Sequence, residues 1–128
     1  ALFDCAGIIV GKDNSPELTS SLYKSASGAA EIVNYIRVTN IRRAISFLKK
    51  NKYWIYGFDS SKINNSKLNF SQKSVLVFGS EGKGIRELVK KECDEIIQIN
   101  MKNNLKFEID SLNVSNATSI ALYQFYSS

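Results

Sequence analysis

Short apolar runs alternate in this chain with segments patterned as amphipathic helices, and this alternation restricts the fold more than any other feature. The runs AGIIVG (6–11) and SVLVFG (74–79) are continuously apolar, which is typical of strands that are covered on both faces. The segments NYIRVTN (34–40), KYWIYGF (52–58) and EIIQIN (95–100) also predict strands. Strands that alternate with helices predict an α/β fold with a mostly parallel sheet and helices on both faces.

Four helices are expected between and after these strands. The first begins near Ser15, a residue suited to cap a helix, with Pro16 at its first position. Another follows Asn40, and two more are expected at about 85–91 and 112–126. The long polar stretches between elements have the length of loops, so the sequence predicts a single domain over 1–128.

Charge and residue usage exclude several kinds of site. Seventeen Lys and Arg residues against twelve Asp and Glu give a net charge of +5, which fits a nucleic-acid partner without requiring one. The chain has no histidine, which excludes a histidine base, a histidine triad and a histidine-ligated zinc within this polypeptide. Cys5 and Cys93 lie far apart and are interpreted as small apolar residues in a reducing cytoplasm, so no metal is expected. No apolar run approaches the roughly 18 residues of a membrane span.

The stretch GSEGKGI (79–85) is the first candidate for a ligand site, because it follows a predicted strand and precedes a predicted helix. Its glycines, Gly79, Gly82 and Gly84, have the spacing G-x-x-G-x-G, which matches neither the dinucleotide turn nor the phosphate loop. A carboxylate at Glu81 would repel a phosphate and suits a cationic or hydroxyl-bearing ligand. The alternative is a strand-to-helix turn that only needs a positive φ angle.

A cluster of small polar residues begins the last predicted helix and forms the second candidate. Ser111, Asn113, Ser115 and Asn116 fall within six positions of an otherwise apolar segment. Capping of the first free N–H groups explains one such residue, because a helix needs one cap. The surplus suggests amide and hydroxyl groups that are directed at a ligand.

Taken together, LVFGSEGKGI (76–85), IIQINM (96–101) and SLNVSNATSIALYQF (111–125) resemble the second and third motifs of the SpoU-type (TrmH-like) RNA ribose 2′-O-methyltransferases. The segment LTSSLYKSASGAAEIVNYIRVTNI (18–41) also fits, above all the subgroup that acts on a guanosine of 23S ribosomal RNA. The resemblance covers nearly the whole chain. It implies an α/β fold with a deep trefoil knot, S-adenosylmethionine as cofactor, RNA as substrate, a homodimer and a cytoplasmic location.

The resemblance also implies roles for individual residues. Three match family positions at the catalytic centre, where they orient the methyl donor and the ribose: Glu81, Ser111 and Asn113. The others would hold the cofactor through backbone groups and apolar contact: Gly79, Gly82, Gly84, Ile99, Met101, Leu112 and Ser115. A carboxylate at Glu81 suits a donor that carries a cationic sulfonium.

The chain departs from the family pattern at three places. The segment MKNNLKFEID (101–110) is longer than expected, and Asn116 stands where members usually carry a small apolar residue. This chain does not contain the family's first motif, N-x-G-x-x-x-R, whose arginine is the base for the 2′-hydroxyl. Its first residues, ALFDCAGIIVG (1–11), resemble the segment that comes after this motif in the family. We therefore expect a C-terminal catalytic fragment that is inactive by itself, since a ribose hydroxyl needs a positioned base.

Three alternatives stay open at this point. The RNA could be a transfer RNA, or the chain could be a non-catalytic module for RNA binding or dimerisation, and S-adenosylmethionine binding would argue against the latter. An ordinary nucleotide-binding domain ranks last, because it would need a G-x-G-x-x-G turn.

Overall fold

The computed structural model describes residues 2–12, 32–59, 70–80, 83–98 and 113–128. The chain divides into two compact units, Ala1–Ala44 and Ile45–Ser128, and each is described by itself. All paired strands are parallel, as the alternation of strands and helices predicts. Whether the two units belong to a single domain stays a prediction.

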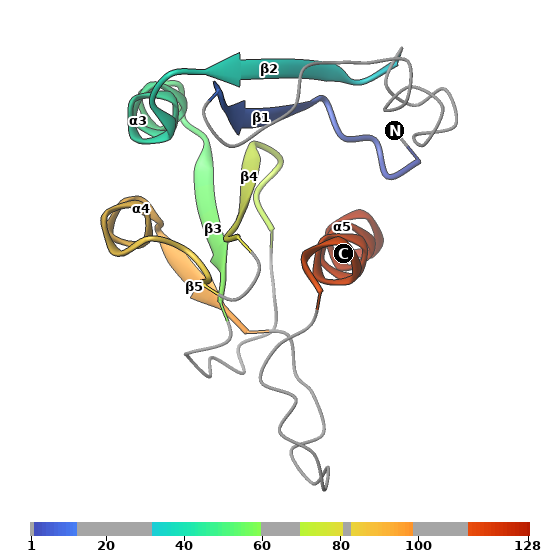
Figure 1. The fold of residues 1–128 in the computed structure, drawn as a ribbon. Helices are drawn as coiled ribbons and strands as arrows, with labels where there is room; N and C mark the ends of the chain where they lie inside the picture. The colour runs from blue at the N-terminus through green and yellow to red at the C-terminus, as the bar shows by residue number, and fades with distance from the viewer. Residues whose placement is uncertain (1, 13–31, 60–69, 81–82, 99–112) are drawn as a thin grey trace, which may run out of the picture. The chain divides into compact units, whose positions relative to one another are not determined.

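The first unit contains a pair of parallel strands, β1 (Gly7–Gly11) and β2 (Asn34–Val38), which lie side by side in Figure 1. Gly7 pairs with Asn34, and the register continues to Gly11 and Val38. Side chains extend the pairing at both ends: Asn34 Nδ2 donates to the Ala6 carbonyl at 3.0 Å, and Arg37 donates to the Lys12 carbonyl at 3.2 Å.

Helix α3 (Ile41–Lys50) begins where the sequence predicts, directly after Asn40. The Asn40 side chain accepts a hydrogen bond from the Arg43 backbone N–H at 3.2 Å, which is the geometry of a helix cap. The apolar side of the helix is anchored by Ile45, which is 3% exposed. The helical spacing of Lys49 predicts a solvated residue, but this prediction is wrong, because its ammonium donates to the Glu92 carbonyl at 3.0 Å and lies 3.8 Å from Asp94.

The second unit is built on a three-stranded parallel sheet in the order β4–β3–β5 (Figure 1). Its strands are β3 (Trp54–Phe58), β4 (Ser74–Phe78) and β5 (Glu95–Ile97). Strand β3 lies in the middle, with Trp54 opposite Ser74 on one side and Tyr56 opposite Glu95 on the other. A central position explains why Ile55 is fully buried.

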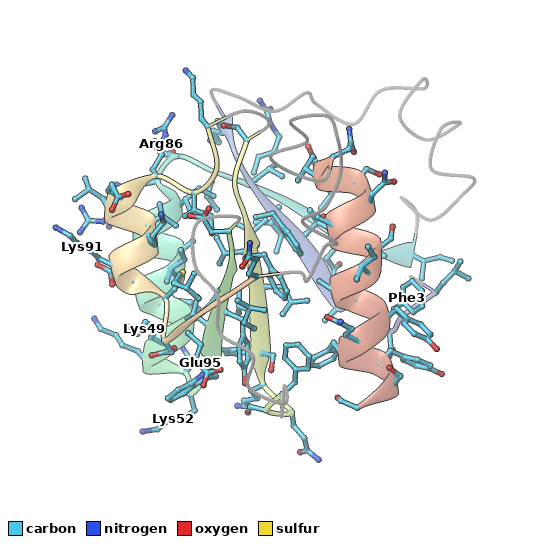
Figure 2. All side chains as sticks on the ribbon, turned by 90° about the horizontal axis from the view of Figure 1, so that it is seen from below. Phe3, Lys49, Lys52, Arg86, Lys91 and Glu95 are labelled. Carbon is cyan, nitrogen blue, oxygen red and sulfur yellow. The ribbon has the colours of Figure 1, made fainter. Side chains whose placement is uncertain are left out.

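Helix α5 (Val114–Ser127) covers one face of this sheet, because Ala121 packs in a cluster with Tyr56, Phe58 and Ile97. The aromatic rings of Phe70, which precedes β4, and Phe125, near the end of α5, lie 5.3 Å apart. This ring contact places the end of α5 near the start of β4, so the helix runs antiparallel to that strand, and Figure 2 shows the two alongside each other. The first turn of α5 therefore lies toward the edge at which β4 ends.

Side chains from other segments pack against the opposite face of β3 at Gly57. A Cβ atom there would lie 2.8 Å from the Ile96 side chain, 2.9 Å from Cys93 Sγ and 3.2 Å from the Ile85 side chain. These residues flank helix α4 (Glu87–Glu92), so that helix belongs to the face opposite α5. Alternation along KYWIYGF predicts that Trp54, Tyr56 and Phe58 pack in the core. This is confirmed for Tyr56 and Phe58, whereas Trp54 at the start of the strand is 44% exposed.

The α/β class with helices on both faces of a parallel sheet is thus confirmed in the second unit. Among the described residues, no helix has the length and apolar character needed to cross a membrane. The helix predicted from Ser15 lies outside the described residues, and so does part of the C-terminal region for which a knot is predicted, 99–112. The knot stays a prediction.

Candidate functional site

The described part of the glycine-rich turn folds back on itself directly after β4. Ser80 and Gly84 form an antiparallel bridge in which the Gly84 N–H donates to the Ser80 carbonyl at 3.0 Å. A Cβ atom at Gly79 would lie 1.9 Å from the Gly84 carbonyl carbon and 2.3 Å from the Ile85 nitrogen. Because both neighbours are backbone atoms, no side chain fits at this position. Gly84 has φ +68°, which confirms the positive φ that the turn alternative requires.

The turn is held against the sheet by the residue that leaves it. Ile85 is 5% exposed, and its side chain lies against Gly57 in the central strand. Arg86 then begins α4 with its side chain exposed, and Figure 2 shows Arg86 and Lys91 on the outer side of this helix. The turn therefore combines a fixed apolar anchor with exposed backbone at the carboxyl end of β4, where parallel sheets bind ligands.

Asp59 lies next to this turn and is a residue that the sequence interpretation missed. It follows β3 at the same edge, and its N–H donates to the Ile97 carbonyl at 3.0 Å. Its side chain is only 7% exposed and lies 2.5 Å from the Lys90 ammonium of α4. The hydrogen bond to Asp59 raises the pKa of Lys90 above its usual value, against the opposing effect of burial. The sequence shows that Asp59 directly follows a predicted strand, which places it at this edge, but it does not show the burial of Asp59 or its pairing with Lys90.

Asn113 caps α5, and its side chain accepts a hydrogen bond from the Ser115 N–H at 2.8 Å. This is the capping role that was one of the two explanations for the polar cluster. Both Asn113 and Ser115 are exposed, and the Ser115 carbonyl accepts from Ser119 Oγ at 3.0 Å. Since α5 runs antiparallel to β4, this first turn lies toward the sheet edge that bears Gly79.

Cys93 serves packing rather than nucleophilic chemistry. Burial raises the pKa of its thiol to about 11, and the neighbouring Asp94 contributes in the same direction. The thiol faces the Val89 carbonyl at 3.4 Å and touches the bare backbone of Gly57. A thiol in such a site is inert at neutral pH, which agrees with the sequence interpretation.

The structure describes four of the residues predicted for the site, and they fall into two groups. Gly79 and Gly84 are brought into direct backbone contact, and Asn113 and Ser115 are joined by the cap of α5. The remaining predicted residues lie outside the described part of the chain: Glu81, Gly82, Ile99, Met101, Ser111 and Leu112. Their roles stay predictions.

The chain is similar to known proteins both at the level of a family and at the level of individual relatives. Residues 1–123 match the model of the SpoU rRNA Methylase family. The chain is 40% identical over 127 residues to the 23S rRNA (guanosine-2′-O-)-methyltransferase RlmB of Escherichia coli K12, and 41% identical over 128 residues to that of Haemophilus influenzae. Each alignment covers 94% of this chain and 50% of the relative, so the chain spans about half the length of these curated relatives.

Solved structures agree at the level of the fold. The SpoU methyltransferase AviRb from Streptomyces viridochromogenes, in complex with AdoMet, has a TM-score of 0.84 at 20% identity, covering 98% of this chain and 48% of that one. A putative RNA methyltransferase of the TrmH family from Porphyromonas gingivalis has a TM-score of 0.82 at 22% identity, covering 97% and 49%. Because the family model spans nearly the whole chain, the resemblance noted from its motifs is confirmed, and the chain belongs to the SpoU rRNA methylase family.

Proposed function

We propose that this chain forms the cofactor-binding part of an S-adenosylmethionine-dependent enzyme that methylates the 2′-hydroxyl of a guanosine in 23S ribosomal RNA. Support comes from the family match and from relatives at 40% identity that bear this activity in their names. The observation that carries the proposal is the backbone contact between Gly79 and Gly84, because it forms a tight glycine turn at the carboxyl edge of a parallel sheet, where such sheets bind ligands.

The cofactor fits the residues that this edge presents. The absence of a side chain at Gly79 lets the turn close on its own backbone, and the cofactor would bind against the main chain of this turn, to which Gly82 and Gly84 also belong. On the other side of the ligand we assign Ile99, Met101, Leu112 and Ser115. When bound, S-adenosylmethionine would supply an electrophilic methyl group on a cationic sulfonium.

The residues assigned to the reacting centre are Glu81, Ser111 and Asn113. A carboxylate at Glu81 would balance the sulfonium charge, while the hydroxyl of Ser111 and the amide of Asn113 would orient the ribose. The proton of the 2′-hydroxyl requires a base. The described carboxylate at this edge, Asp59, is paired with Lys90 and therefore suits a positioning role.

RNA is the proposed partner of the exposed cations beside the turn. Lys83 and Arg86 are both exposed, one within the turn and the other at the start of α4. Phosphate contacts from such residues position an RNA without reading its sequence. The relatives named as 23S rRNA enzymes favour ribosomal RNA over transfer RNA, and ribosomal RNA implies a cytoplasmic site of action.

A homodimer is the proposed assembly. Tyr123 and Tyr126 on α5 are 61% and 62% exposed, and Ile120 one turn earlier is 37% exposed. An apolar stripe outside the core face of a helix favours a second protein surface. Sedimentation at micromolar concentration should give twice the monomer mass, and Tyr123→Ser with Tyr126→Ser should give the monomer. A wild-type monomer would contradict the dimer.

The cofactor is tested by calorimetric titration with S-adenosylhomocysteine. Saturable binding that is weakened by Gly82→Val is expected, whereas binding of NAD or ATP without a response to S-adenosylhomocysteine would reject the proposal. An RNA-binding module without a cofactor would bind ribosomal RNA and leave S-adenosylhomocysteine unbound.

The reaction is tested by tritiated methyl transfer to 23S rRNA. A chimera that adds the preceding half of the Escherichia coli relative should transfer methyl groups, and the chain alone should give background. In the chimera, Glu81→Ala should lower turnover by on the order of 100-fold while changing RNA affinity little. Robust transfer by the chain alone would show that the base lies within these 128 residues.

A further inference from the structure

Three separate segments meet at the Asp59 carboxylate. Its own backbone continues the pairing of β3 with β5 through the hydrogen bond to the Ile97 carbonyl. Its Oδ2 atom lies 2.5 Å from Lys90 Nζ, which belongs to α4. Its Oδ1 atom lies 3.5 Å from the position that a Cβ atom would take at Gly84, so the carboxylate is packed against the turn. A single side chain thus touches the sheet, the helix and the turn.

Burial makes this ion pair unusual within the described part of the chain. The Asp59 side chain is 7% exposed and the Lys90 side chain 19%, whereas the ion pair between Lys49 and Asp94 is 36% and 19% exposed. Buried ion pairs often add little net stability, because desolvation offsets the attraction between the charges. Their best attested use is to fix one arrangement among several, since breaking one partner leaves an uncompensated charge.

The arrangement that this pair would fix is that of the glycine-rich turn. Gly79 and Gly84 have no side chains that could hold the turn in place, and the geometry leaves no room for a side chain at Gly79. Ile85 anchors the end of the turn by apolar contact, which resists separation from the sheet but does not set direction. The charged contact at Asp59 is directional, and it joins the end of the central strand to the helix after the turn.

We propose that Asp59 and Lys90 are a positioning pair that holds the two described ends of the turn, Gly79–Ser80 and Gly84–Ile85, in their cofactor-binding arrangement. The inference rests on the proposed function, because the turn is assigned there to S-adenosylmethionine. Neither residue takes part in methyl transfer. The pair acts through the backbone of Gly84, whose N–H forms the bridge to Ser80.

Two measurements test the pair, and one of them needs no cofactor. Hydrogen exchange of the Gly84 amide reports the bridge to Ser80 directly, relative to the amides of β3. In Asp59→Asn and in Lys90→Met this exchange should accelerate by at least about tenfold, because the bridge opens more often. The affinity for S-adenosylhomocysteine should fall by about tenfold in both variants, and Lys90→Arg should restore most of it by keeping the charge.

The second ion pair of the sheet provides the matched control. Asp94 accepts a hydrogen bond from the Ile55 N–H at 2.8 Å and pairs with Lys49, so it lies toward the start of β3, away from the turn. Asp94→Asn should therefore lower the stability to urea without changing Gly84 exchange or S-adenosylhomocysteine affinity. An equal response to Asp94→Asn, or no response to Asp59→Asn and Lys90→Met, would overturn the proposal.

The outcomes also separate this inference from the proposed function. If the wild-type chain binds no S-adenosylhomocysteine but Gly84 exchange responds to Asp59→Asn, the positioning pair stands and the cofactor assignment fails. If the wild type binds and neither variant changes affinity or exchange, the cofactor assignment stands and the pair has no positioning role. Should Asp59→Asn not fold, Lys90→Met and Lys90→Arg give the same comparison from the partner residue.

Discussion

Substitution of Gly79 by alanine tests the turn most directly, and its effect can be worked out from the geometry. The added Cβ atom would lie 1.9 Å from the Gly84 carbonyl carbon, whereas ordinary contact begins at 3.4 Å, so the two strands of the turn must separate by about 1.5 Å. The obstructing atoms belong to the backbone and cannot rotate away. A separation of this size breaks the Gly84–Ser80 hydrogen bond, which is 3.0 Å long.

The expected consequence is a loss of cofactor affinity that exceeds the loss of stability. A displacement of about 1 Å can reduce function by about 100-fold, and we expect the affinity for S-adenosylhomocysteine to fall by about that factor. The lost hydrogen bond contributes about 1 kcal/mol to the free energy of unfolding, and the strain of forcing the backbone apart adds about 1–3 kcal/mol. Calorimetric titration and urea unfolding of the same samples measure the two effects.

Two other glycines serve as controls. At Gly11 a Cβ atom would lie 3.8 Å from its nearest neighbour, so Gly11→Ala should leave affinity unchanged. At Gly84 the nearest atom is 3.5 Å away, but φ is +68°, so Gly84→Ala should cost about 1–2 kcal/mol from backbone strain and less affinity than Gly79→Ala. Wild-type affinity in folded Gly79→Ala would refute the assignment of this turn to the cofactor.

Two further predictions concern the cap of α5 and the buried thiol. Asn113→Ala should lower the free energy of unfolding by about 1 kcal/mol, because the hydrogen bond to the Ser115 N–H is lost. Asn113→Asp keeps the cap and should lower only methyl transfer in the chimera. Equal stability of Asn113→Ala and the wild type would contradict the cap. In a Cys5→Ser background, Cys93 should react with iodoacetamide at pH 8 about 100-fold more slowly in the folded chain than in urea, since its pKa rises from 9.0 to about 11. The free energy of unfolding should also fall as the pH rises from 9 toward 11, because the thiol ionises in the unfolded chain but stays neutral in the folded one. Equal reaction rates would contradict the raised pKa.

The sequence predicted the elements well where local pattern and burial agree. The continuous apolar run at 74–79 became β4, and Asn40 capped α3 as its position before an amphipathic segment indicates. Periodicity failed at the ends of elements. Trp54 was grouped with Tyr56 and Phe58 by alternation, but a residue at the start of a short strand has fewer neighbours to cover it, and Trp54 stays 44% exposed.

Long-range contacts were beyond the sequence for a different reason. Lys49 has the helical spacing of a solvated cation, and only the packing of α3 near the end of α4 shows that its ammonium reaches the Glu92 carbonyl. In the sequence, Asp59 is the first residue of a polar stretch, and this pattern predicts a loop residue. Its burial depends on Lys90, 31 positions later, and no local pattern carries information about that pairing.

The glycine-rich turn illustrates how a structural and a functional interpretation can both hold. The positive φ at Gly84 supports the view that the turn needs glycine for its shape, and that requirement alone would explain one glycine. It does not explain Gly79, where the constraint is the approach of backbone to backbone. A connection between a strand and a helix can be made without such an approach. The turn keeps its backbone this close beside a buried ion pair, and the cofactor that we propose for this turn would account for the approach.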